Sequence, residues 1–157
     1  MTVMPTLEGG LRLDAEDASD WELLRSIVVD ANCCKTDLAS RLGGLMSEEA
    51  GGEDWEELVV PDLREGFQDE LAEIGALIES AVFASASGPG PIWITPGEAF
   101  PWYSSLNQAR LALEEIYHFG PEDKADPLNM TPVQRAAFIR SGFYSDIQSL
   151  LLRHVMK

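Results

Sequence analysis

Few of the side chains that catalysis, metal binding and phosphate binding usually require are present in this chain. Its 157 residues include only two cysteines and two histidines, and 11 basic side chains stand against 27 acidic ones. Nucleic acid and anionic membranes both need a cationic surface, so neither is an expected partner. No stretch approaches the roughly 18 apolar residues of a membrane span, and residues 1–14 lack the basic and apolar regions of a signal peptide. We therefore expect a cytoplasmic protein.

The recognisable motifs of reactive and ligand-binding sites are also missing. The two cysteines, Cys33 and Cys34, are adjacent, and no C-x-x-C motif occurs. Neighbouring side chains on a helix point about 100° apart, so a disulfide between the two would be strained. We expect one thiol in the core and the other at its edge. The segment 85–91, SASGPGP, lacks the lysine and the spacing of a phosphate-binding loop.

Acidic side chains are concentrated in the first half of the chain. Residues 1–80 contain 20 acidic and 5 basic side chains, a net charge of −15, whereas residues 81–157 contain 7 and 6, a net charge of −1. The first half contains three adjacent acidic pairs, Glu48-Glu49, Glu53-Asp54 and Glu56-Glu57. These pairs lack the spacing of a calcium loop, so we interpret them as a solvated face. Such a surface attracts a basic protein or a cation, although acidity also serves solubility alone.

The spacing of apolar residues predicts a mostly α-helical chain that begins with a β-hairpin. Two short apolar runs flank the glycine pair 9–10, which can supply the positive φ of a hairpin turn. The next apolar stripe predicts either one helix over 18–43 or two helices with a break near 35–36. The glycine pair 43–44 is the predicted stop of this segment.

Three further stripes predict the remaining helices. Pro61 suits the first position of a helix, and the stripe that follows extends to Val82. Another stripe runs over 99–116, and Gly120 follows its end. The last helix begins after Thr131, a residue that can cap it, and continues close to the C-terminus.

Between these helices lie one break and one short strand. We interpret 85–91 as a flexible linker and expect 92–95 to form a strand that pairs with the N-terminal hairpin. The predicted fold is mainly α, a bundle of four to five helices with a minor two- to three-stranded β element near the N-terminus. We expect one helical domain over 1–157.

The helix predicted over 99–116 also carries a family resemblance. Its segment from Trp102 to Leu113, WYSSLNQARLAL, resembles the W-x-x-x-L-N-x-x-R-L-x-L core of DUF2017, a bacterial family of unknown function. The order of the other elements is similar over most of the chain, but 143–147 reads FYSDI where the family leads us to expect a tryptophan. The resemblance implies no established activity. Genes of this family in actinobacteria are often found beside that of ClpS, the adaptor of a Clp protease, which points to proteostasis.

One polar row on this helix is the candidate ligand- or partner-binding site. Tyr103, Asn107, Arg110, Glu114 and Tyr117 share an arc of roughly 80°, and Arg110 can reach both Asn107 and Glu114. In a structural role, Arg110 would pair with Glu114 and a distant carboxylate while Asn107 capped a loop. In a binding role, Arg110 would hold a carboxylate or phosphate in a cleft. We expect the structural role.

The remaining polar residues suggest no metal, cofactor or catalytic site. His118 and His154 lie near predicted helix ends, where a cation is favourable. Glu114 and His118 have the spacing of one ligand pair, but carboxylate-bridged metal sites in bundles use E-x-x-H together with glutamates from partner helices. No base can be assigned to a serine or cysteine nucleophile.

These observations predict a non-enzymatic interaction or regulatory module, with a link to Clp-adaptor proteostasis implied by the family resemblance. The alternative is a small-molecule or metal-binding enzyme with a site around the Asn107-Arg110-Glu114 face. No basic recognition helix supports a transcription factor. Trp55, Val59 and Val60 are expected to be exposed in an acidic region, which favours a homodimer.

Overall fold

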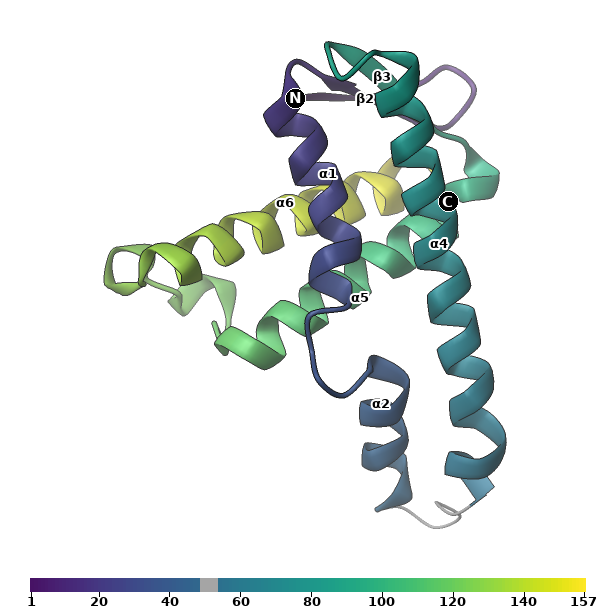
Figure 1. The fold of residues 1–157 in the computed structure, drawn as a ribbon, viewed down its shortest axis with the longest axis vertical. Helices are drawn as coiled ribbons and strands as arrows, with labels where there is room; N and C mark the ends of the chain where they lie inside the picture. The colour runs from purple at the N-terminus through teal and green to yellow at the C-terminus, as the bar shows by residue number, and fades with distance from the viewer. Residues whose placement is uncertain (49–53) are drawn as a thin grey trace.

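The computed structural model describes residues 1–48 and 54–157, which form five α-helices and one three-stranded sheet (Figure 1). This confirms the predicted fold class. The acidic residues at 49 and 53 lie outside the described residues. In chain order the elements are β1 (Thr2–Pro5), β2 (Leu11–Ala15), α1 (Ala18–Ala31), α2 (Leu38–Ser47), the π-helical turn η1 (Trp55–Val59), α4 (Val60–Ala84), β3 (Gly90–Ile94), η2 (Pro96–Glu98), α5 (Ala99–Tyr117), η3 (Glu122–Lys124), η4 (Pro127–Asn129) and α6 (Pro132–His154).

The sheet is antiparallel throughout, in the order β1-β2-β3. The predicted hairpin is confirmed: Gly9 has φ +85°, and a Cβ at Gly10 would collide with the carbonyl oxygen of Ile94. Leu11 lies opposite Ile94, and both are buried. The predicted strand at 92–95 therefore does pair with the hairpin, although it begins two residues earlier.

The segment predicted as one or two helices contains two. Asp17 caps α1 by accepting from the backbone N–H groups of Ser19 and Asp20, and α1 ends at Ala31. Residues 32–37 separate it from α2. The predicted stop at the glycine pair 43–44 is wrong, because α2 continues to Ser47.

Helix α5 lies at the centre of the packing and contacts α1, α4 and α6. Trp21, Trp102 and Tyr144 are the largest fully buried side chains of the core. The indole N–H of Trp21 donates to the carbonyl oxygen of Gly88 at 2.8 Å, which fastens the connection between α4 and β3. The break predicted at 85–91 lies between α4 and β3, where residues 85–89 form a turn and residues 90–91 already belong to β3.

Helix α2, η1 and the first turns of α4 form a projection that we call the arm. Figure 1 shows it extending beyond the crossing of α4 with α5. Its inner contact is close, because a Cβ at Gly43 would lie 2.5 Å from Cγ2 of Val60. The exposure predicted for the aromatic and branched residues here is wrong. Val60 is buried and Trp55 half-buried, whereas Leu58 is 68% exposed.

Candidate functional site

The predicted polar row lies along one edge of α5. The helix follows a capping box in which Glu98 accepts from the backbone N–H of Thr95 at 2.9 Å. Its inner face buries apolar side chains such as Trp102 and Leu106. The row members Tyr103, Asn107, Arg110 and Glu114 are all half-buried, at the border between the core and solvent.

Arg110 is held by an amide rather than by a carboxylate. Its Nη1 donates to Oε1 of Gln148 at 2.7 Å, and Nε2 of Gln148 donates to the carbonyl oxygen of Tyr103 at 3.1 Å. Gln148 lies on α6 and is only 3% exposed. Among the described residues, no acidic side chain pairs with Arg110, and its buried Nε has no hydrogen-bond acceptor. The expected pairing with Glu114 and a distant carboxylate is therefore wrong.

Glu114 fixes the loop that leaves α5. Its Oε1 accepts from the backbone N–H of Gly120 at 3.0 Å, and Gly120 has φ +73°. This is the loop-capping role that the sequence suggested for Asn107. No described residue forms a hydrogen bond with the Asn107 side chain.

Arg110 and Glu114 line a hollow between α5 and α6 that we call the Arg110 hollow. Its volume is about 280 Å³. Ser141 and Ser145 of α6 add hydroxyl groups, and Tyr103 and Asn107 take no part in it. The row therefore divides into a pair that faces the hollow and a pair that does not. Phe119, Gly120, Pro121, Phe138 and Gly142 complete the lining.

The candidate site predicted from the sequence did not include the residues of α6 at this hollow. Ser141 and Ser145 are four residues apart with Gly142 between them, so they form a small polar stripe on one helix face. Gln148 is a polar residue between the buried Ile147 and Leu151. Both patterns are visible in the sequence, but neither shows that α6 packs against α5, because that contact depends on the tertiary fold.

A second polar cluster joins α1 to α6 and is fully satisfied. Asp30 is 5% exposed and accepts from Arg140 at 2.7 and 3.0 Å and from the hydroxyl of Tyr144 at 2.7 Å. The hydroxyls of Ser26 and Tyr144 lie 2.6 Å apart. Hydrogen bonding to Asp30 raises the pKa of Arg140, and burial raises the pKa of Tyr144. Both carboxylate oxygens of Asp30 and the hydroxyl of Tyr144 have partners, so this cluster holds α1 and α6 together.

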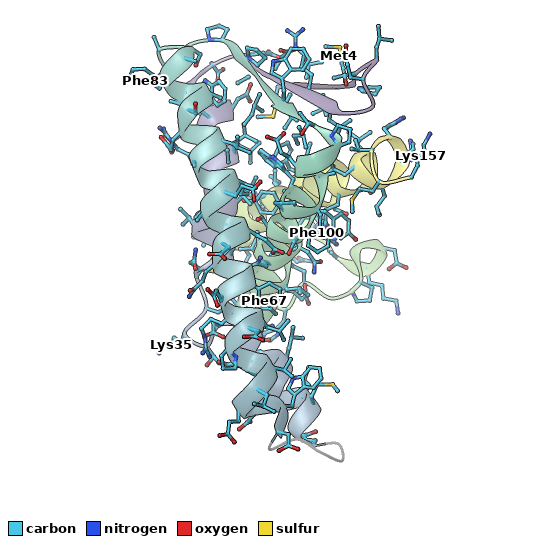
Figure 2. The ribbon with its side chains drawn as sticks, turned by 90° about the vertical axis from the view of Figure 1, so that its right-hand side faces the viewer. Met4, Lys35, Phe67, Phe83, Phe100 and Lys157 are labelled. Carbon is cyan, nitrogen blue, oxygen red and sulfur yellow. The ribbon has the colours of Figure 1, made fainter. Side chains whose placement is uncertain are left out.

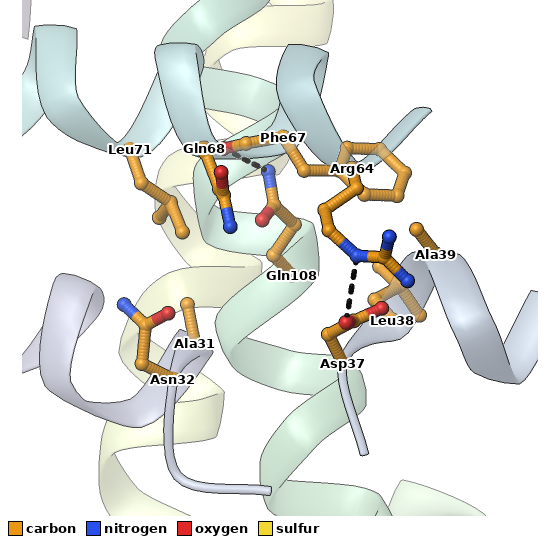
Figure 3. Close-up of a pocket in the computed structure, with 10 residues that line it drawn as sticks. All are labelled: Ala31, Asn32, Asp37, Leu38, Ala39, Arg64, Phe67, Gln68, Leu71 and Gln108. Atoms are coloured by element: carbon orange, nitrogen blue, oxygen red, sulfur yellow. Dashed lines mark hydrogen bonds and ion pairs between the residues drawn. The ribbon is translucent and has the colours of Figure 1, made fainter. Parts of the chain in front are cut away.

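The cavity in Figure 3 is too small for a metabolite. Its volume is about 50 Å³, enough for a few water molecules. Nε of Arg64 donates to Asp37 at 2.9 Å on one side, and Nε2 of Gln108 donates to the carbonyl oxygen of Phe67 at 3.4 Å on the other. The cavity therefore lies within the packing of α2 and α5 against α4.

The cysteines lie in the loop 32–37 rather than on a helix. Cys33 is exposed, and the half-buried Cys34 donates to the carbonyl oxygen of Ala112 at 3.4 Å, so the expectation of a core thiol is wrong. His118, the residue that follows α5, is exposed with φ 49°, and the Glu114 side chain bonds instead to Gly120. In the part of the chain that the structure describes, no three His, Cys, Asp or Glu side chains come together as a metal site.

Comparison with known proteins identifies a family but no individual similar protein. The sequence model of DUF2017, a domain of unknown function, matches residues 37–155. This range contains the arm and the Arg110 hollow. No curated protein and no solved structure matches the chain. Across the described residues, no helix has both the length and the apolar character needed to cross a membrane.

Proposed function

The chain belongs to DUF2017, a family of domains of unknown function, and we propose that it is a non-enzymatic interaction or regulatory module whose partner is a protein with a basic surface. The observation that carries this proposal is the arm. It presents Leu45 and Leu58, which are 66% and 68% exposed, on two elements that pack against each other. Large apolar side chains this exposed are typical of contact sites when polar groups surround them.

The polar surroundings of these leucines are acidic. Residues 42–63 contain seven acidic side chains and no basic one. The two arginines nearest to this stretch are already engaged. Arg41 pairs with Glu115 of α5 at 3.1 Å, and Arg64 pairs with Asp37 at 2.9 Å. The apolar side chains therefore belong to a stretch of negative charge with no basic residue of its own, which a basic partner complements.

The exposed side of α4 extends this field. Asp62, Glu65, Asp69 and Glu73 follow one another at intervals of three and four residues, and all are exposed. None of them pairs with a basic side chain among the described residues. Like charges at this spacing destabilise a helix by about 0.2–0.5 kcal/mol per pair. A basic partner would remove this repulsion on binding.

A comparison of three forms of the chain in extracts of the source cell tests the proposal. Wild type is compared with the arm variant Leu45→Ser/Leu58→Ser and with the control Phe83→Ser, which replaces an even more exposed apolar residue, 89% exposed, at the far end of α4 (Figure 2). We expect wild type and control to retain a partner at low salt and to release it as salt screens the charges. The arm variant should retain little. Equal capture by all three forms, or no capture at low salt, would contradict the proposal.

The link to Clp-adaptor proteostasis is a narrower form of this proposal, supported by the family's gene neighbourhood. It predicts that purified ClpS adaptor, or the Clp protease that it serves, binds the chain directly. We expect a salt-sensitive complex in sedimentation or calorimetry that the arm variant weakens. Absence of a complex at low salt would reject the Clp link and leave a different basic partner to be identified.

The enzyme alternative depends on the Arg110 hollow. A polar row sealed in the core would exclude an enzyme site at Asn107, Arg110 and Glu114, and a deep pocket lined by these residues would favour one. The three residues are instead half-buried, and Arg110 and Glu114 line a hollow of about 280 Å³. Ser141 and Ser145 line the hollow, but no histidine lies there to act as their base. The geometry therefore supports binding at this place better than catalysis.

A further inference from the structure

We propose that the Arg110 hollow binds a small zwitterion of the amino-acid class, with the ligand's carboxylate on Arg110 and its ammonium group on Glu114. This site is separate from the arm and does not depend on the proposed protein partner. The hollow lies between α5 and α6, beside the loop that follows α5.

The guanidinium of Arg110 is positioned but not neutralised. Gln148 holds Nη1 from one side and is itself anchored to the backbone of Tyr103. The buried Nε has no acceptor, and no carboxylate among the described residues lies within ion-pair distance. Nη2 also lacks a protein acceptor in the described chain. Because Nε is buried, a carboxylate in the hollow would bind through Nη2, and an arginine that is held in place without an acidic partner is suited to such a ligand.

Glu114 supplies the opposite charge at the same hollow. Its Oε1 accepts from the N–H of Gly120, which fixes the carboxylate, while Oε2 has no bonded partner among the described residues. Arg110 and Glu114 are neighbours on α5, yet they do not pair with each other. One free cation and one free anion side by side match a ligand that carries both charges. A phosphate dianion would instead be repelled by Glu114.

The walls set the size and character of the ligand. A volume of about 280 Å³ is just below the range of pockets for drug-sized molecules, so it suits a small metabolite. Ser141 and Ser145 offer hydroxyl groups. Phe119 and Phe138 meet edge to face, with ring centroids 5.4 Å apart, and supply an apolar wall for a side chain. Gly142 leaves the α6 side open, since a Cβ there would meet nothing within 4 Å.

Binding of free amino acids to the purified full-length chain tests the proposal. Each of the twenty is added at about 1 mM, and binding is followed by the melting temperature and by ligand-observed NMR. We expect at least one free amino acid to bind and its amide and N-acetyl forms, each lacking one charge, to bind at least tenfold more weakly. No binding by any amino acid, equal binding of either blocked form, or tighter binding of inorganic phosphate would overturn the proposal.

Two variants locate the site. Arg110→Gln removes the carboxylate-binding group, and Gly142→Leu adds an apolar side chain to the hollow from α6, at a position where a Cβ would meet nothing within 4 Å. We expect at least a tenfold loss of affinity in each, while the exposed Arg153→Gln binds as wild type does. Circular dichroism checks that each variant is folded, and Gly142→Leu keeps the test decisive if Arg110→Gln is not. Undiminished binding in folded Gly142→Leu would place the ligand elsewhere.

Discussion

At the scale of single residues, Asp30 is the one charged side chain that is buried among the described residues. Asp30 has lost most of its hydration, and it is stable there because Arg140 and Tyr144 together supply three hydrogen bonds. A buried ion pair adds little net stability when intact, but removal of one partner leaves an uncompensated charge. The consequence is an asymmetry between single and double substitutions.

Arg140→Met is therefore expected to lower the free energy of unfolding by about 2–4 kcal/mol. The double variant Asp30→Leu/Arg140→Met should recover part of this loss, because no charge then remains buried. Urea denaturation monitored by circular dichroism measures both. Arg153→Met, an exposed arginine on the same helix, is the control and should stay within about 0.5 kcal/mol of wild type. If Arg140→Met unfolds at the wild-type urea midpoint, this account of Asp30 is wrong.

Cys33 provides a prediction about reactivity. Desolvation of its thiol, with the neighbouring Cys34 and Asp30 adding to the effect, raises its pKa from 9.0 to about 11. A raised thiol pKa means less thiolate at neutral pH, so the exposed Cys33 should react with iodoacetamide more slowly than a free cysteine peptide does. The rate should continue to rise up to about pH 11. Mass spectrometry of peptides labelled at a series of pH values measures this, and fast labelling at pH 7 would contradict it.

The candidate site shows what single residues in a sequence can and cannot reveal. Helical periodicity correctly placed Arg110 and Glu114 on the same face of α5. It could not show that Arg110 would meet Gln148, because the two residues are 38 positions apart and their contact depends on how α6 packs. Because opposite charges attract, we expected a carboxylate partner for Arg110. The side-chain amide of the buried Gln148 accepts its hydrogen bond instead.

At the scale of elements, local signals identified the helices and strands well and their ends less well. The hairpin turn, the proline near the start of α4 and the N-cap at Thr131 all depend on local chemistry, and each lies where it was predicted. The glycine pair 43–44 was wrongly predicted to end the helix, and the reason lies in the tertiary packing. Gly43 is in mid-helix because α2 and Val60 approach too closely for a side chain, which a helix-stop rule cannot detect.

Gly43→Ala is consequently expected to destabilise the chain by about 1–3 kcal/mol, because Cγ2 of the buried, stiff Val60 lies 2.5 Å from the new Cβ. Gly66→Ala is the matched control. It also lies within a helix but meets nothing within 4 Å, so helix propensity should stabilise it by about 0.5–1 kcal/mol. Thermal unfolding distinguishes the two signs. A stabilising Gly43→Ala would mean that the arm does not pack as described.

The N-terminal cap of α2 gives the arm a pH dependence. Asp37 accepts from the backbone N–H of Ser40 at 2.7 Å and pairs with Arg64. Desolvation opposes the change, but these hydrogen bonds outweigh it and lower the pKa of Asp37 below 3.8. A lowered carboxyl pKa stabilises the fold fully above the unfolded value and loses that effect as the pH falls through the folded value. Stabilisation by Asp37 should therefore be constant near neutral pH and disappear below about pH 3.8.

Asp37→Ala measures this contribution. At neutral pH it should lower the free energy of unfolding by about 1 kcal/mol, the usual size of a lost cap. The difference between wild type and variant should shrink as the pH falls below about 3.8, although other carboxyl groups titrate in both proteins. Denaturation curves at a series of pH values give the difference directly. A gap that persists at the lowest pH would assign the effect to something other than the ionised carboxylate.

At the scale of the whole molecule, net charge makes the two proposed kinds of association respond to salt in opposite ways. Two copies of a chain with a formal net charge of −16 repel each other, whereas a basic partner is attracted. Salt screens both effects, since the Debye length falls from about 10 Å at 0.1 M to about 3 Å at 1 M. A homodimer should therefore strengthen as salt rises, and a complex with a basic partner should weaken.

Sedimentation over a series of concentrations and salt levels checks the predicted homodimer. Val60 is buried, so self-association through the arm would use Leu45 and Leu58. We expect any dimer to grow with salt and to disappear in Leu45→Ser/Leu58→Ser. A monomer at all concentrations in high salt would rule out the homodimer, and a dimer that the substitution leaves unchanged would locate it on a different surface.

The central position of β2 in the sheet bears on the order in which the chain can fold. Its inner residue Leu11 pairs with Ile94, 83 positions later, and besides α1 it is α6, the last helix of the chain, that contacts β2. During synthesis β2 therefore lacks its partner strand β3, and α1 lacks its contact with α5, until the second half of the chain has emerged. Exposed strands of this kind are prone to aggregate. We expect the 20 acidic side chains of residues 1–80 to keep this segment apart from other copies of itself by charge repulsion.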